Sequence, residues 1–96
     1  MNLLKSLTMP IISTFFGIIV RMYFDDHQPP HFHAEYQGQH ALFRISDGVM
    51  FEGRLPPRAV KIVSEWAKIH GEDLMRDWDL AQNHLPLQRI PGADDD

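Results

Sequence analysis

A two-residue turn between matching strands constrains this chain more than any other feature. Residues 32–36 and 41–45 alternate apolar and polar side chains, and Gln37-Gly38 suits the tight turn between them. Pairing Tyr36 with Gln39 across the turn puts the apolar residues of both segments on one face: Phe32, Ala34, Tyr36, Ala41, Phe43 and Ile45. The pattern therefore predicts a β-hairpin with one core-facing side.

The opposite side of this hairpin collects polar groups. Side chains alternate along a strand, so the same register sets His31 across from Arg44, His33 across from Leu42 and Glu35 across from His40. We therefore expect a face that carries histidines, a carboxylate and an arginine.

Two further strands are expected around the hairpin. Residues 17–24 are rich in β-branched and aromatic side chains and predict a strand, which Pro29-Pro30 ends. Asp47-Gly48 is a strong hairpin signal that leads into residues 49–52. A tight turn there would put Met50 on the core face and Phe51 on the histidine face, so either both faces are partly covered or a bulge intervenes.

Helices are expected after the strands. Pro56-Pro57 can open a helix, Gly71 can stop it, and a second helix should end near His84. The apolar residues recur at helical spacing: Ala59, Ile62, Val63, Trp66 and Ile69, then Leu74, Trp78 and Ala81. The fold class is therefore α+β, an antiparallel meander of about four strands followed by a C-terminal helical hairpin packed on one face.

Composition narrows the classes of function. The 96 residues carry a formal net charge of −4, which disfavours the basic face that nucleic-acid binding usually needs, DNA above all. The chain has no cysteine, which excludes disulfides and zinc–thiolate clusters. The longest apolar run, residues 15–20, is too short for a membrane helix of roughly 20 residues.

We expect a cytoplasmic protein. We also expect the acidic tail at residues 91–96 to be disordered.

The segment Asp25-Asp26-His27-Gln28-Pro29-Pro30-His31-Phe32-His33 is the candidate site. His31 and His33 project from one face of a strand, so both can grip one metal ion. The third ligand would come from His27, Asp25, Asp26 or Glu35. We take Asp26, His27, His31 and His33 as the candidate metal ligands.

Two other interpretations of the same residues stay open. His31 and His33 could act as general base and acid without a metal, with Arg44 or Arg54 stabilising a phosphoryl charge, as in RNA cleavage. Alternatively, His31 hydrogen-bonds the Pro-Pro turn and His33 is a half-exposed strand residue. His40, His70 and His84 have no local cluster, and Trp66 and Trp78 are assigned to packing.

Several motifs occur in an order that resembles a known family. They are Met9-Pro10-Ile11-Ile12-Ser13, Phe16-Gly17-Ile18, Arg21-Met22-Tyr23-Phe24, Asp26-His27, Pro29-Pro30-His31-Phe32-His33-Ala34, Glu52-Gly53-Arg54-Leu55-Pro56, Glu65-Trp66-Ala67, Leu74 and Trp78. On these residues the chain resembles the bacterial domain-of-unknown-function family 4160 from about Met9 to Ile90. The resemblance implies that Met9 is the usual start, so that residues 1–8 are an N-terminal extension of one domain at 9–90.

The resemblance implies a context rather than an activity. The family has no established function, but its genes often lie beside a second small protein, and such pairs have been suspected to be toxin–antitoxin modules. Some members carry a transcriptional-regulator label. Our hypothesis is a small bacterial protein of such a module, whose His27, His31 and His33 perform acid–base or metal chemistry, with RNA as the candidate substrate. The alternative is a non-catalytic module or regulator that docks a partner protein through the Pro-Pro-His loop.

Overall fold

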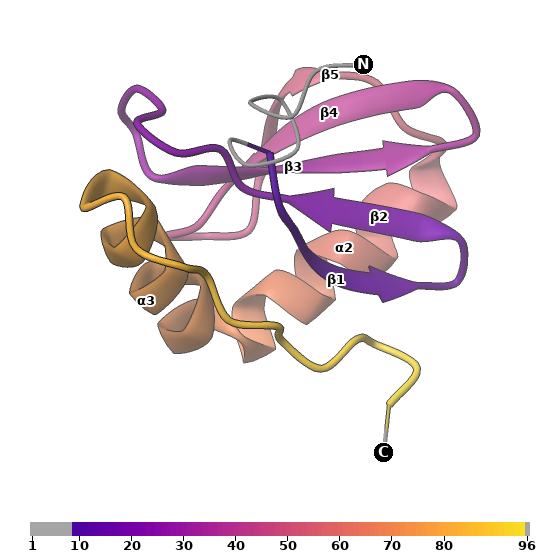
Figure 1. Ribbon diagram of the computed structural model, residues 1–96. Helices are drawn as coiled ribbons and strands as arrows, with labels where there is room; N and C mark the ends of the chain where they lie inside the picture. Colours follow the sequence, from indigo (N-terminus) through magenta and orange to yellow (C-terminus); the bar gives the residue numbers. More distant parts are fainter. Residues whose placement is uncertain (1–8, 96) are drawn as a thin grey trace.

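Five strands form one antiparallel sheet in the computed structural model, which describes residues 9–95. Their order in the sheet follows the chain: β1 (Ile11–Phe15), β2 (Ile18–Arg21), β3 (His31–Tyr36), β4 (Gln39–Arg44) and β5 (Met50–Gly53). Helices α2 (Pro57–Ile69) and α3 (Gly71–Gln82) follow and lie on one side of the sheet (Figure 1). The α+β prediction is confirmed, with one strand more than expected.

The additional strand is β1. Its partner positions shift between Ile11 and Ser13, so a bulge interrupts the regular alternation. Ile12 and Ser13 are both buried although they are neighbours in the chain. Because period-two alternation is the main sequence signal of a half-buried strand, this irregular segment gave no clear pattern.

The central hairpin has the predicted register. Tyr36 pairs with Gln39, and His31, His33 and Glu35 lie across from Arg44, Leu42 and His40 respectively. The alternative at β5 is also resolved, because the register shifts between Leu42 and Phe43, which pair with Glu52 and Met50. A bulge is present, and both faces are covered, since Met50 packs against the core and Phe51 lies edge-on to His31 at 5.7 Å.

The hydrophobic core lies between the sheet and the helices. Phe32 and Phe43 stack across the hairpin with ring centroids 5.5 Å apart, and Trp66 of α2 meets Phe32 edge-on at 5.7 Å. The first helix ends at Ile69, just before Gly71 as predicted, but Gly71 itself begins α3, since His70 alone separates the helices. Within the described chain, neither helix is long and apolar enough to cross a membrane.

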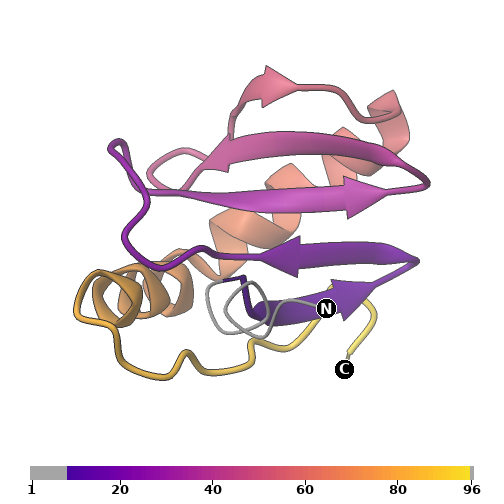
Figure 2. The same cartoon turned by 45° about the horizontal axis from the view of Figure 1, so that its top comes forward.

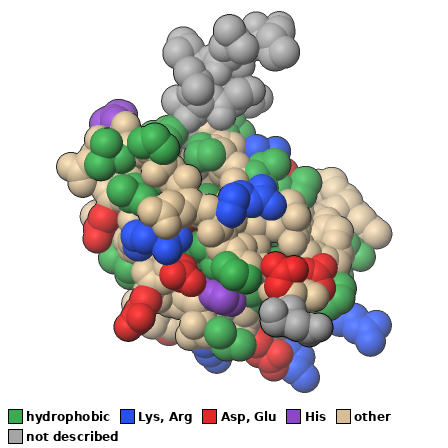
Figure 3. Space-filling model, turned by 60° about the horizontal axis from the view of Figure 1, so that its bottom comes forward, with side chains coloured by type: hydrophobic (Ala, Val, Ile, Leu, Met, Phe, Trp, Pro, Cys, Tyr) green, Lys and Arg blue, Asp and Glu red, His purple; other side chains and the backbone are tan. Residues whose placement is uncertain are grey.

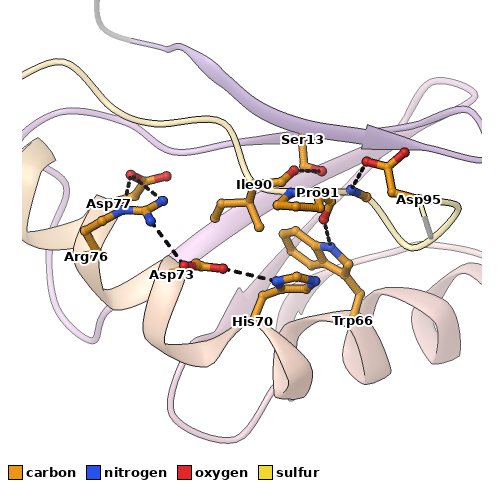
Figure 4. Close-up of polar contacts among 10 residues, drawn as sticks. Ser13, Trp66, His70, Asp73, Arg76, Asp77, Ile90, Pro91 and Asp95 are labelled. Atoms are coloured by element: carbon orange, nitrogen blue, oxygen red, sulfur yellow. Dashed lines mark hydrogen bonds and ion pairs between the residues drawn. The ribbon is translucent and has the colours of Figure 1, made fainter.

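The segment after α3 returns along the first strand (Figure 4). Ile90 N–H donates to the Ile12 carbonyl at 2.8 Å, Ser13 Oγ donates to the Ile90 carbonyl at 2.8 Å, and Trp66 Nε1 donates to the Pro91 carbonyl at 2.8 Å. The disordered tail at 91–96 stays a prediction, and the proposed extension at 1–8 lies outside the described residues.

Candidate functional site

The connection from β2 to β3 brings the candidate site together. Figures 1 and 2 both place this connection beside α3. Gln82 Nε2 donates to the Asp26 carbonyl at 3.1 Å, and His84 Nε2 lies 2.9 Å from Asp25 Oδ2. These contacts tie the connection to the end of α3, so Asp26 can lie over the first residues of β3.

Asp26 joins the two strand histidines. Its Oδ2 atom lies 3.0 Å from His31 Nε2 and 3.0 Å from His33 Nε2. Its other oxygen, Oδ1, accepts a hydrogen bond from the His27 backbone N–H at 2.9 Å. One carboxylate of the connection thus organises all three histidines of the motif.

His31 is enclosed on every side. Its side chain is fully buried, with the Trp78 ring centroid 5.5 Å away and Phe51 edge-on at 5.7 Å. Its Nδ1 atom lies 2.7 Å from the Pro29 carbonyl, which can only accept, so Nδ1 carries a proton. The interpretation in which His31 hydrogen-bonds the Pro-Pro turn predicted this bond.

The other nitrogen of His31 has an unusual environment. Nε2 is buried and has no hydrogen-bond partner in the described part of the chain, although Asp26 Oδ2 lies only 3.0 Å away. The distance is short, but the oxygen lies off the line along which an N–H would point. A neutral His31 with Nδ1 protonated therefore holds a bare nitrogen lone pair against a carboxylate oxygen.

His27 completes a group of three possible metal ligands. Its side chain is 75% exposed, and its ring centroid is 5.4 Å from that of His31. One ligand atom each of Asp26, His27 and His31 lies within 4.8 Å of the other two. His33 is not in this group, but it contacts the same carboxylate.

His33 connects Asp26 to a second histidine. Its Nε2 donates to Asp26 Oδ2 at 3.0 Å, and its Nδ1 lies 2.9 Å from Nε2 of His40. The carboxylate can only accept, so this tautomer leaves His33 Nδ1 to accept the proton of His40. Tyr23 stacks on the His33 ring at 4.0 Å. His33 is only 8% exposed, so the expectation that it is half-exposed is wrong.

The pKa shifts assign charges to this pair. Burial lowers the pKa of His33 and outweighs its hydrogen bond to Asp26, which acts in the opposite direction. Burial also raises the pKa of Asp26, but the hydrogen bonds from His33 and the His27 N–H and the nearby imidazoles outweigh it, and the net pKa is lowered. The two shifts agree on an ionised Asp26 beside a neutral His33 near pH 7.

Arg44 is the predicted catalytic residue that the structure engages elsewhere. It lies across from His31 in the register, as expected. Its guanidinium makes a two-pronged ion pair with Asp47, with Nη2 2.7 Å from Oδ2 and Nε 3.0 Å from Oδ1. Asp47 thus occupies two of the three guanidinium nitrogens that could hold a phosphoryl group.

Sequence reasoning missed three residues of the site. His40 was assigned no cluster, yet it pairs with Glu35 and therefore lies diagonally across from His33, a signal that the register contained. Tyr23 and Gln82 gave no such signal, because their contacts depend on how the connection and α3 fold over the strand.

Comparison with known proteins supports one family assignment. The sequence profile described as "domain of unknown function (DUF4160)" matches residues 17–79, which is more than half of the chain. Neither the curated proteins nor the solved structures contain a match. The matched residues include the Pro-Pro-His-Phe-His motif and the strands that carry it. The chain therefore belongs to the DUF4160 family of domains of unknown function.

Proposed function

We propose that this protein binds a divalent transition-metal ion through Asp26, His27 and His31, as a centre for hydrolytic chemistry. The observation that carries the proposal is the buried Nε2 of His31, which faces a carboxylate oxygen without a hydrogen bond. Two imidazoles and a carboxylate are a common ligand set of catalytic zinc and iron sites.

The opposite nitrogen of His31 supports a role as ligand. Metal-binding histidines usually donate their second ring N–H to a carbonyl or carboxylate, which orients the ring and fixes its tautomer. His31 makes such a bond to the Pro29 carbonyl. The Pro29 carbonyl therefore fixes the orientation of the His31 ring through Nδ1, while Nε2 faces Asp26.

The spacing of the donor atoms also suits a shared ion. In a tetrahedral zinc site with bonds of about 2.0–2.1 Å, neighbouring ligand atoms lie about 3.3 Å apart and point at the metal rather than at each other. Asp26 Oδ2 and His31 Nε2 are 3.0 Å apart and off-axis. A doubly protonated His31 paired with Asp26 is the competing arrangement, and it predicts no metal binding.

Exposure gives this centre an open side. His31 is buried, whereas His27 is largely exposed, so three protein ligands leave a position for water or substrate. His33 serves as a positioning residue in this proposal, because its N–H holds Asp26 Oδ2. This assigns His33, which we first grouped with the ligands, a supporting role.

Metal titration tests the proposal directly. We expect stoichiometric binding of zinc, manganese or nickel by calorimetry and elemental analysis, and a loss of more than about 100-fold in Asp26→Asn and His27→Ala, which exceeds the range of second-shell effects. His70→Ala, which removes an imidazole between the two helices, is the matched control. No binding by the wild type, or equal affinity in all variants, would reject the metal centre in favour of the His31–Asp26 pair.

The family resemblance adds a biological proposal. We infer a cytoplasmic protein of a two-gene module with a small partner protein, and with RNA as one candidate substrate. The charge of the protein disfavours RNA as a substrate, because the net charge is −4 and acidic and basic side chains are interspersed on the face in Figure 3.

Expression without the partner should slow growth and degrade RNA, and the double variant His31→Ala/His33→Ala should abolish both. Equal growth and intact RNA with either protein would reject a toxic nuclease.

A docking role is the second candidate. Residues 27–29, at the tip of the connection, are exposed and could contact a partner protein directly. This candidate predicts a stable complex that survives chelation of metal, whereas a complex that needs the metal centre would dissociate. Co-purification with and without a chelator separates the two.

A further inference from the structure

A hollow lies next to the histidine pair. Its volume is about 430 Å³, which suits a small molecule, and its lining includes Tyr23, Glu35, Tyr36, Gln37, Gln39 and His40. Two of these residues contact His33: Tyr23 stacks on the ring, and His40 lies 2.9 Å from Nδ1. The hollow is therefore connected through His33 to Asp26.

The hollow has the electrostatic character of a cation site. Glu35 contributes a carboxylate, and the lining contains no lysine or arginine. Arg21 holds Glu35 Oε2 at 3.0 Å, but its own Nη1 donates to the Met9 carbonyl, and it does not line the hollow. The lining side chains offer a phosphate no lysine or arginine, whereas they offer a cation the Glu35 carboxylate, whose charge Arg21 partly balances.

The tyrosines strengthen this character. Aromatic ring faces attract ammonium and guanidinium groups, and Tyr23 and Tyr36 both line the hollow. Burial raises the pKa of Tyr23, and the negative charges of Glu35 and Asp26 add to this while Arg21 opposes it. The charge part of this shift comes mainly from Glu35, the same carboxylate that lines the hollow.

We propose that this hollow is the ligand pocket of the metal site, and that it takes a small organic cation with an ammonium or guanidinium group. The substrate role depends on the proposed metal centre, whereas cation binding depends only on the pocket. Glu35 would share its carboxylate between Arg21 and the cation, Tyr23 and Tyr36 would contact it, and His40 would link the occupied pocket through His33 to the metal ligand Asp26.

Titration with simple probes tests this proposal. Butylammonium and methylguanidinium should give saturable amide chemical-shift changes at residues 35–40 and at Tyr23, and inorganic phosphate and butanol should not. Glu35→Gln should weaken binding of the cations about tenfold, because it removes the charge and keeps the shape. Glu52→Gln, an exposed carboxylate of β5, is the matched control and should bind as the wild type does.

The outcomes separate the two proposals. Repeating the titration on the metal-deficient Asp26→Asn variant measures the pocket alone. Cation binding in both proteins, together with metal binding by the wild type and a metal affinity that changes when the cation is bound, supports the whole proposal. Metal binding without saturable cation binding, or equal binding of cations and phosphate, overturns the pocket and leaves the metal centre. Cation binding with no metal binding overturns the metal centre and with it the substrate role.

Discussion

The two faces of one sheet differ in how they are buried. On the helix side, Phe32 and Ala34 of β3 pack into an apolar core. On the other side, His31 and His33 of the same strand are also buried, but under the connection that carries Asp26. One strand thus supplies a core from its even-numbered residues and a polar site from its odd-numbered residues.

This difference separates stability from chemistry. The helix side is stabilised by removing apolar surface from water, which needs shape but no charge. The histidine side is held by a carboxylate, imidazoles and one amide hydrogen bond from α3. We therefore expect substitutions on the helix side to act mainly on unfolding, and those on the histidine side mainly on binding.

The largest expected effect is on the helix side. Phe32→Ala should lower the free energy of unfolding by about 3–5 kcal/mol, because Phe32 is fully buried between Phe43 and Trp66. Urea denaturation measures this loss. A loss below that of any histidine-side variant would contradict the division between the faces.

Asp26→Asn should have a smaller effect on unfolding of the metal-free protein. We expect a loss of about 1–3 kcal/mol, since the substitution removes the charged acceptor between His31 and His33. Asp79→Asn, an exposed carboxylate on α3, should change stability by less than about 0.5 kcal/mol. If saturating metal stabilises Asp26→Asn as much as the wild type, Asp26 is not a ligand.

Gln82→Ala tests the attachment of the connection to α3. Loss of its hydrogen bond to the Asp26 carbonyl should cost about 1 kcal/mol in unfolding, and metal affinity should fall about 10–100-fold because Asp26 is held less firmly. Exposed Gln88→Ala should leave metal affinity unchanged. Equal metal affinity in both variants would mean that α3 does not position the site.

The smallest expected effect concerns the buried carboxyl group of Asp77, on the helix side. Burial raises the pKa of Asp77, opposed by the Gln88 N–H and Arg76, and Oδ2 has no hydrogen-bond partner among the described residues (Figure 4). A raised pKa means that the folded state binds the proton more tightly. The wild type should therefore lose stability relative to Asp77→Asn as pH rises from the pKa of an unfolded aspartate through the folded value, and the gap should then stay constant.

Urea denaturation of both proteins across this pH range measures that gap. General acid denaturation affects the two chains alike, so only their difference is compared. A gap that does not change with pH, or a wild type that gains stability relative to the variant as pH rises, would show that Asp77 is not destabilised by burial.

The sequence predicted most of the fold and some of the residues and contacts of the candidate site. Alternation around Gln37-Gly38 predicted the register that places His31 and His33 on one face, and helical spacing predicted α2 and α3. It missed β1, whose bulge breaks the alternation, and the role of His40. Arg44 was placed correctly in the register, but its pairing with Asp47 was not foreseen.

The sequence by itself determined the family, the fold class and the face on which His31 and His33 lie, because these follow from local periodicity and turn chemistry. Only the tertiary structure decided that the connection closes over that face. Asp26 reaches the two histidines because Gln82, 56 residues further along the chain, holds its carbonyl. Contacts between such distant segments leave no periodic pattern, since they depend on how the sheet and α3 pack.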